Sequence, residues 1–186
     1  MLTTQLWWFV ARSSGLIAWG AGLASILWGL ALSTRALGRQ PRPAWLLDLH
    51  RLLGGLCVGF VGLHLVALLA DSFVEISPAD LVIPWYSSYR STDVAWGVLA
   101  LWLLAAVEVS SLLQRTLSRR VWRGIHLASY GVAVLATAHA VGTGTDVGSP
   151  LFRWTALAGL GAIGFFTIYR LLAPGGLHPA RDLSGR

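Results

Sequence analysis

Five long apolar runs dominate the sequence and leave few choices of fold. A helix needs about 20 apolar residues to cross the hydrocarbon core of a bilayer. Five runs meet this length, at about 7–32, 46–70, 94–113, 120–142 and 151–173. We therefore predict an all-α integral membrane bundle with five transmembrane helices, and no separate soluble catalytic domain. The first run lacks the basic n-region of a signal peptide, so we interpret it as a retained span.

The composition agrees with a membrane protein and excludes several other classes. Only 12% of the 186 residues are charged, against about a quarter in soluble domains. This excludes a soluble enzyme, a disordered chain and a nucleic-acid reader. The single cysteine, Cys57, excludes a disulfide framework, an iron–sulfur cluster held by four thiolates and a c-type haem attachment.

Basic residues predict the orientation of the bundle. All positive side chains are Arg, and three lie in each of the loops after the first and third spans (Arg35, Arg39, Arg42, Arg115, Arg119 and Arg120). Positive residues accumulate on the cytoplasmic side. The 71–93 loop instead carries mainly acids, so we expect it to face outward. The N-terminus is then outside, and residues 174–186 form a disordered cytoplasmic tail after a membrane domain at 1–173.

Four of the five histidines lie within predicted spans, where ionisable groups are costly and usually functional. His50 and His64 share the second span, and His126 and His139 share the fourth. His178 lies in the tail. A separation of 14 residues returns His64 to within about 40° of His50, roughly 21 Å along the helix axis. One face of the second span therefore presents two imidazoles at two depths.

The histidines of the fourth span do not share a narrow stripe. Their separation of 13 residues places His139 about 140° around an ideal helix from His126. The sector between them holds mainly small residues, against which a porphyrin could lie, and a local departure from α geometry would help. Periodicity alone does not decide between one cofactor and two.

The second and fourth spans run in the same direction, so histidines pair naturally by depth. His50 pairs with His126 near the cytoplasmic side, and His64 with His139 near the outside. Two imidazoles at each depth fit two bis-His b-type haems, whereas zinc prefers three or four close protein ligands. The alternative is a haem-free scaffold or small transporter in which the histidines only bond neighbouring helices.

Arginines near the histidines are candidates for binding haem propionates, because guanidinium groups pair well with carboxylates. Arg51 and Arg123 are candidates for the inner haem. Three others are candidates for the outer haem (Arg12, Arg90 and Arg153). Each could equally be a topogenic or snorkelling residue.

Glu108 is an acid within the third span. It could serve a proton or quinone site, although an ion pair with Arg115 or Arg51 is the simpler interpretation.

The histidine spacings and their flanking residues resemble the ferric-reductase-like transmembrane domain. The resemblance covers roughly residues 12–146 and rests on H-x13-H in the second span and H-x12-H in the fourth. It also includes the pattern W-R-x-x-H-x-x-x-Y (Trp122, Arg123, His126 and Tyr130) and the segment IPWYSSYR at 83–90. This domain is the haem-bearing core of ferric reductases, NADPH oxidases and the membrane subunit of the bacterial periplasmic methionine-sulfoxide reductase system.

The resemblance implies two stacked b haems, with His50 and His126 as inner ligands and His64 and His139 as outer ones. It implies a multi-pass protein of the bacterial cell membrane that moves electrons across it. Ferric reductases and NADPH oxidases carry a flavin domain after their last span, whereas about a dozen residues follow the last predicted span here. We therefore expect a cytoplasmic flavin reductase or a membrane quinol as donor, and an acceptor that docks near the 71–93 loop. The alternative within this class is a self-sufficient reductase of metal or oxygen.

Overall fold

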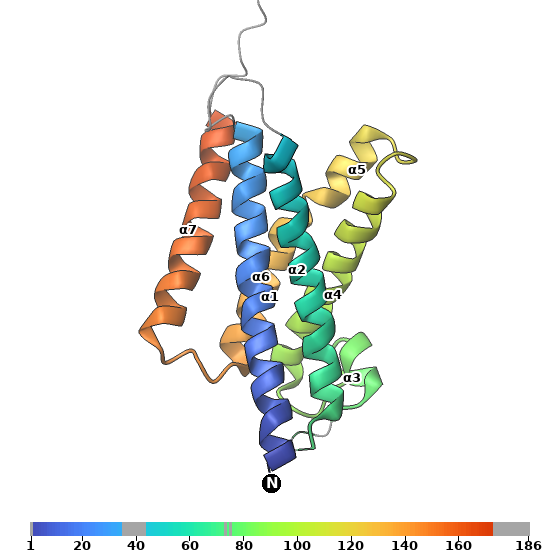
Figure 1. The fold of residues 1–186 in the computed structure, drawn as a ribbon, viewed down its shortest axis with the longest axis vertical. Coiled ribbons are helices and arrows are strands. Elements are labelled where there is room, and N and C mark those ends of the chain that lie inside the picture. The colour runs from blue at the N-terminus through green and yellow to red at the C-terminus, as the bar shows by residue number, and fades with distance from the viewer. Residues whose placement is uncertain (1, 35–43, 73, 75, 173–186) are drawn as a thin grey trace, which may run out of the picture.

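The computed structural model describes residues 2–34, 44–72, 74 and 76–172, and this part of the chain is helical throughout apart from its turns. Its helices are α1 (Leu2–Thr34), α2 (Ala44–Ala70), α3 (Pro78–Val82), α4 (Ser91–Leu112), α5 (Arg119–His126), α6 (Ser129–Thr143) and α7 (Pro150–Leu172) (Figure 1).

Five helical segments are long and apolar enough to span a membrane, which confirms the predicted fold class. They cover Gln5–Ser33, Ala44–Ala70, Ser91–Leu112, Arg119–Thr143 and Pro150–Leu172. Each lies close to the predicted run at both of its ends. The predicted tail at 174–186, with His178, lies outside the described residues.

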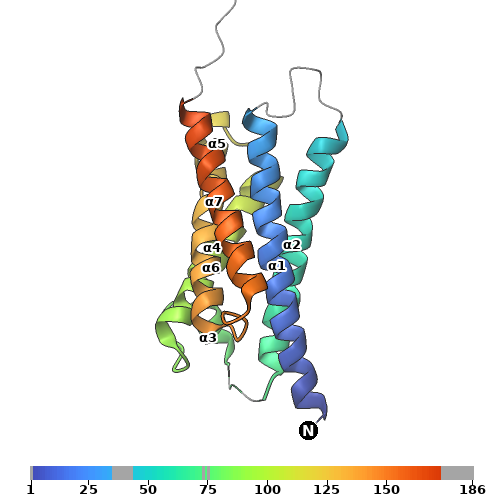
Figure 2. The ribbon, with the colours of Figure 1, turned by 90° about the vertical axis from the view of Figure 1, so that its left-hand side faces the viewer.

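The helices form an up-and-down bundle in which α1 and α2 lie side by side at the front of Figure 1 and α4 and α6 lie behind them, as the turned view of Figure 2 shows. The most extensive contacts are between α1 and α2 and between α4 and α6, and α7 packs against α1. α2 and α6 run in the same direction, as predicted. We call the end of the bundle that carries α3 and the α6–α7 loop the α3 end, and the opposite end the α5 end (Figure 1).

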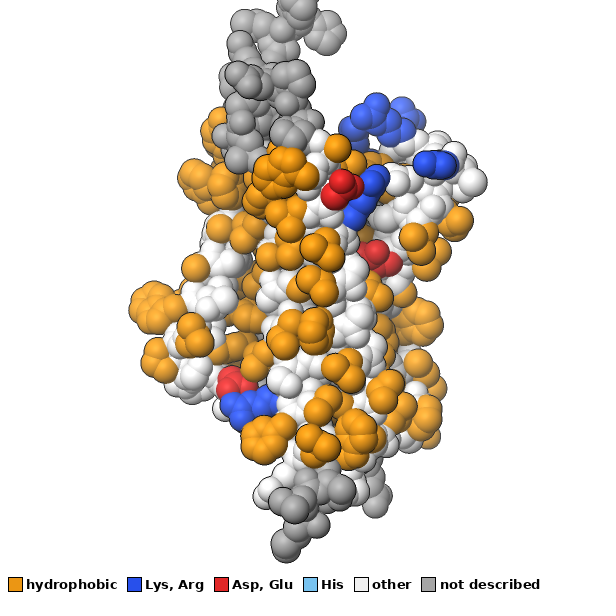
Figure 3. Space-filling view, in the orientation of Figure 1, with side chains coloured by type: hydrophobic (Ala, Val, Ile, Leu, Met, Phe, Trp, Pro, Cys, Tyr) orange, Lys and Arg blue, Asp and Glu red, His pale blue; other side chains and the backbone are white. Residues whose placement is uncertain are grey.

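Side-chain size sorts the residues between the interior and the lipid-facing surface. Many buried positions hold small residues, such as Ala11, Ser14, Ala67 and Ala95, while large apolar side chains such as Trp154 are exposed. Apolar side chains cover most of the face in Figure 3, and charges gather mostly towards its two ends. Helices in lipid gain little from hiding apolar surface, so they associate through close contact of small residues.

The fourth span is not one continuous α-helix, because it breaks between α5 and α6. At the break, Ala128 N–H donates to Ile125 O (2.9 Å) and Tyr130 N–H donates to Leu127 O (3.2 Å). These are the three-residue hydrogen bonds of a 3₁₀ turn. Each 3₁₀ residue advances about 120° instead of 100°. Two or three such residues therefore reduce the predicted offset of about 140° between His126 and His139 by about 40–60°.

A short capped helix lies in the segment predicted only as an outer loop. Ser77 caps α3, and its main-chain N–H donates to Asp80 Oδ2 (2.8 Å). The Ser77 hydrogen bonds lower the pKa of Asp80 below its usual value. At the far end of α3, Val82 O accepts a hydrogen bond from Trp102 Nε1 of α4 (3.0 Å). The cap and this bond hold the segment against the side of α4.

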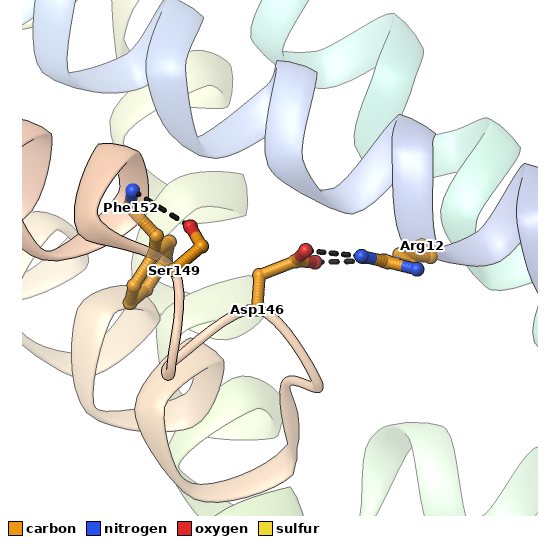
Figure 4. Close-up of polar contacts among 4 residues, drawn as sticks. All are labelled: Arg12, Asp146, Ser149 and Phe152. Atoms are coloured by element: carbon orange, nitrogen blue, oxygen red, sulfur yellow. Dashed lines mark hydrogen bonds and ion pairs between the residues drawn. The ribbon is translucent and has the colours of Figure 1, made fainter.

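An ion pair closes the α3 end of the bundle between α1 and the α6–α7 loop. Arg12 donates from Nε to Asp146 Oδ2 (2.7 Å) and from Nη2 to Oδ1 (Figure 4). In the same loop, Ser149 Oγ accepts from Phe152 N–H at the start of α7 (3.1 Å). The Arg12 guanidinium holds the pKa of Asp146 below its usual 3.8.

We predict that Asp146→Asn lowers the melting temperature of the detergent-solubilised protein at pH 7 by roughly one to three degrees. A carboxylate with a depressed pKa stabilises the folded state above its unfolded pKa, and this contribution is lost as the pH falls through the folded pKa. The difference between the two proteins should therefore shrink below about pH 4.

Asp48→Asn is the matched control, because the Arg51–Asp48 pair is longer (3.4 Å) and both side chains are more than half exposed (61% and 66%). This variant should melt like the wild type. An Asp146→Asn deficit that stays constant down to about pH 3 would contradict the assignment.

Candidate functional site

His50 and His126 meet near the α5 end of the bundle. His50 comes from the second turn of α2, and His126 is the last residue of α5. Their ring centroids lie 6.1 Å apart, with an angle of 68° between the ring planes. The structure thus brings together the two histidines that depth alone predicts as a pair.

His64 and His139 lie near the α3 end and line one cavity of about 320 Å³. Small and apolar residues line it as well, mainly from α1, α2, α4 and α6, among them Gly15, Gly97 and Ala136. α2 supplies His64 and α6 supplies His139, so this pair also comes from the two co-directional helices. In the described part of the chain, His50 and His126 are therefore neighbours at one depth, and His64 and His139 line the same cavity at the other.

Main-chain carbonyls fix three of the four rings through Nδ1. His64 Nδ1 lies 2.7 Å from Ala11 O, and His139 Nδ1 lies 2.7 Å from Asp93 O. His50 Nδ1 lies 3.0 Å from Ser25 O. A carbonyl oxygen can only accept, so Nδ1 must carry the proton in each ring. The lone pair of a neutral imidazole is then on Nε2, which is the state that a metal ligand requires.

His126 is held differently from the other three. Its Nδ1 lies 3.5 Å from Ser111 Oγ, and this hydroxyl donates its own proton to Val107 O (2.7 Å). Ser111 Oγ can therefore accept from Nδ1. The ring also stacks on Trp122, with centroids 5.0 Å apart and an interplanar angle of 24°. His126 is thus positioned by a hydroxyl and an aromatic face.

A glycine lies beside each ring that a carbonyl holds, one helical turn after the carbonyl. A Cβ on Gly15 would come within 3.0 Å of His64 Nδ1, and one on Gly97 within 2.7 Å of His139 Nδ1. A Cβ on Gly29 would lie 3.1 Å from His50 Cε1. Only a residue without a side chain lets the imidazole approach the helix so closely.

These three glycines were not predicted as part of the site, although the sequence carries a signal for two of them. Gly15 and Gly29 have the same spacing along α1 as His50 and His64 have along α2. Because α1 and α2 are antiparallel, each glycine meets one histidine.

Most of the arginines proposed to bind haem propionates have partners within the chain, and the others are exposed. Arg51 pairs with Asp48, and Arg123 is exposed on α5. At the α3 end, Arg12 pairs with Asp146, and Arg90 Nη1 donates to Gly142 O. A role for any of them at a cofactor stays a prediction.

Arg153 is exposed near the start of α7. Glu108 lies against α2, where a Cβ on Gly54 would be 3.4 Å from Glu108 Oε1. The ion pairs among described residues are Arg12–Asp146 and Arg51–Asp48, so Glu108 does not form the expected pair with Arg51 or Arg115.

The spacing of the His50 and His126 rings suits a metal between them. An imidazole bound through Nε2 at about 2.0 Å has its ring centre about 3.1 Å from the metal, so two opposed rings have centres about 6.2 Å apart. The described residues contain no cluster of three or more His, Cys, Asp or Glu side chains. Two ligands per depth are too few for a tetrahedral zinc site but are enough for iron already held by a porphyrin.

The family of the chain follows from a sequence comparison. Residues 14–137 match the family described as the ferric reductase like transmembrane component. The chain belongs to this family. Searches of curated proteins and of solved structures gave no match. The match to the ferric reductase-like family includes His50, His64 and His126, and it ends just before His139.

We predict that Gly97→Ala destabilises the protein by about 1–3 kcal/mol, because the new methyl group overlaps the His139 ring and pushes it off its bond to Asp93 O. The measurement is the free energy of unfolding in mixed micelles. Gly59→Ala is the control, since no atom lies within 4 Å of where its Cβ would be. Alanine there should leave the stability unchanged or raise it slightly. Equal effects at both positions would show that contact with His139 does not matter.

Proposed function

We propose that this protein carries electrons across the membrane through two b-type haems. His50 and His126 would hold the haem at the α5 end, and His64 and His139 the haem at the α3 end. The observation that supports this most is the placement of four imidazoles at two depths, three of them held through Nδ1 by main-chain carbonyls. Membership of the ferric reductase-like family agrees with it.

In this proposal the protein holds each histidine ring in one tautomer and one orientation. Each Nδ1 hydrogen bond selects one tautomer and orients the ring, which makes Nε2 a stronger ligand. A haem held by the two histidines of either pair would supply one-electron transfer rather than oxygen binding. We therefore assign electron transfer, rather than oxygen activation at iron, to both sites.

The depths of the two sites fit a path across the bilayer. The spacing of His50 and His64 on α2 corresponds to about 21 Å along the axis of an α-helix. The hydrocarbon core is about 30 Å thick. The two pairs would therefore lie near opposite faces of the core, with apolar side chains between them.

The expected orientation of the bundle in the membrane gives the direction of electron transfer. The Arg-rich loop between α4 and α5 lies at the α5 end, so we propose that this end is cytoplasmic and the N-terminus is outside. The donor would be a cytoplasmic flavin reductase or a membrane quinol. The acceptor would reach the α3 end, where Trp85 and Tyr86 are more than half exposed (55% and 60%).

We predict that His64→Ala or His139→Ala removes one haem and leaves most of the other. Each variant deletes one axial ligand of the site at the α3 end and leaves His50 and His126 intact. The measurement is the haem-to-protein ratio together with the reduced-minus-oxidised absorption spectrum. We expect the ratio to fall from two to one.

His178→Ala is the control, because His178 belongs to neither pair and its loss should leave the spectrum unchanged. Full haem loading in both His64→Ala and His139→Ala would reject the pairing. A wild-type protein that binds no haem when expressed with ample haem supply would reject the function.

Electron transfer across the membrane itself can be tested in vesicles. We predict that haem-loaded protein in liposomes reduces external ferricyanide using dithionite trapped inside. The transfer moves charge, so valinomycin with potassium should accelerate it by relieving the opposing potential. His64→Ala should slow ferricyanide reduction at least tenfold, because loss of the haem at the α3 end lengthens the distance that electrons must cross. A rate equal to that of protein-free liposomes would contradict the proposal.

A further inference from the structure

One buried hydrogen-bond donor near the α5 end has no acceptor. Trp122 Nε1 is the only buried side-chain nitrogen or oxygen among the described residues that lacks a hydrogen-bond partner. A buried indole N–H normally finds an acceptor, and leaving it unpaired is unfavourable. The exception therefore needs an explanation.

Other indoles of the bundle find acceptors within the chain. Trp19 Nε1 donates to Thr137 Oγ1 (2.9 Å), and Trp28 Nε1 donates to Leu46 O (2.8 Å). Trp102 Nε1 donates to Val82 O, as described above. The fold thus supplies partners for indoles on α1 and α4. At Trp122 the missing acceptor would come from a bound molecule.

The position of Trp122 indicates which molecule this is. Trp122 precedes His126 by one turn of α5, and the two rings stack at an interplanar angle of 24°. The N–H lies in the plane of the indole. It therefore points out of the side of the stack, as the imidazole nitrogens do, and not at His126. An acceptor at this edge lies next to His126, and so close to whatever His126 ligates.

We propose that Trp122 Nε1–H donates a hydrogen bond to a propionate carboxylate of the haem held by His50 and His126. This inference rests on the proposed function. The carboxylates are the strong acceptors at the edge of a haem, and charge-assisted bonds to them exceed neutral ones in strength. Two axial ligands leave a porphyrin free to rotate about the line between them. Trp122 is a positioning residue that stops this rotation from one side.

The test compares haem with its dimethyl ester, which has no ionised carboxylate. Full-length protein carrying His64→Ala, which leaves only the site at the α5 end, is prepared without haem and titrated with each compound by absorbance. Trp122→Phe keeps an aromatic ring on His126 but removes the N–H. For each protein, the measured quantity is the ratio of its affinity for haem to its affinity for the ester. We expect this ratio to be at least tenfold higher with Trp122 than with Phe at this position.

Trp28→Phe is the matched control, because it removes an indole N–H whose acceptor lies within the chain. Its preference for haem over the ester should equal that of the His64→Ala parent. Equal preferences with Trp122 and with Phe would overturn the role of Trp122. A parent that binds neither compound would instead overturn the proposed function, and the inference with it.

A second measurement leaves Trp122 in place and so does not depend on the folding of the Phe variant. Cobalt(III) protoporphyrin is diamagnetic and accepts two axial ligands. In ¹⁵N-labelled protein, one indole N–H proton signal should lie further downfield with this compound than with its dimethyl ester, whose porphyrin ring current is the same. The same signal position with both compounds would contradict the hydrogen bond.

Discussion

The hydrogen bond between a helix carbonyl and a histidine of the neighbouring helix is the constraint on which the candidate site depends. A carbonyl inside an α-helix already accepts from the N–H one turn later. The carbonyl can accept a second hydrogen bond, from a histidine of the neighbouring helix, only if the residue one turn later leaves room for the imidazole ring. Glycine at this position removes the obstacle, as in the pairs Ala11 with Gly15, Ser25 with Gly29 and Asp93 with Gly97.

The same interaction sets the register of α1 against α2. Ala11 and Ser25 have the same spacing along α1 as their bonded histidines, His64 and His50, have along α2. A shift of α1 by one turn would break both bonds together and place side chains where glycines now lie. α1 contributes no proposed ligand, yet it holds both histidines of α2. This gives α1 a role that its hydropathy alone does not reveal.

The sequence predicts the bundle well because its main determinants are local. Run length and hydropathy locate the spans, and the depths of the histidines in two co-directional spans predict the pairs. The break at Leu127 and Ala128 could not be placed, since neither residue is a strong helix breaker and the change depends on packing around His126. The glycine contacts were missed because they pair residues of different helices. The α3 cap was missed although Ser77 and Asp80 carry the capping-box signature.

The break in the fourth span explains why His126 is held differently. On α2 the spacing of the histidines is close to a whole number of turns, so a straight helix presents both to α1. On the fourth span the spacing is shorter by a single position, so a straight helix could not present both rings to the histidines of α2. The 3₁₀ turn rotates α5 relative to α6 and brings His126 to His50. His126 thereby meets Ser111 Oγ and Trp122, where the other three rings meet a carbonyl beside a glycine. The fourth span can therefore place a histidine at each of the two depths. Its first histidine, His126, lacks the carbonyl contact that holds the other three rings.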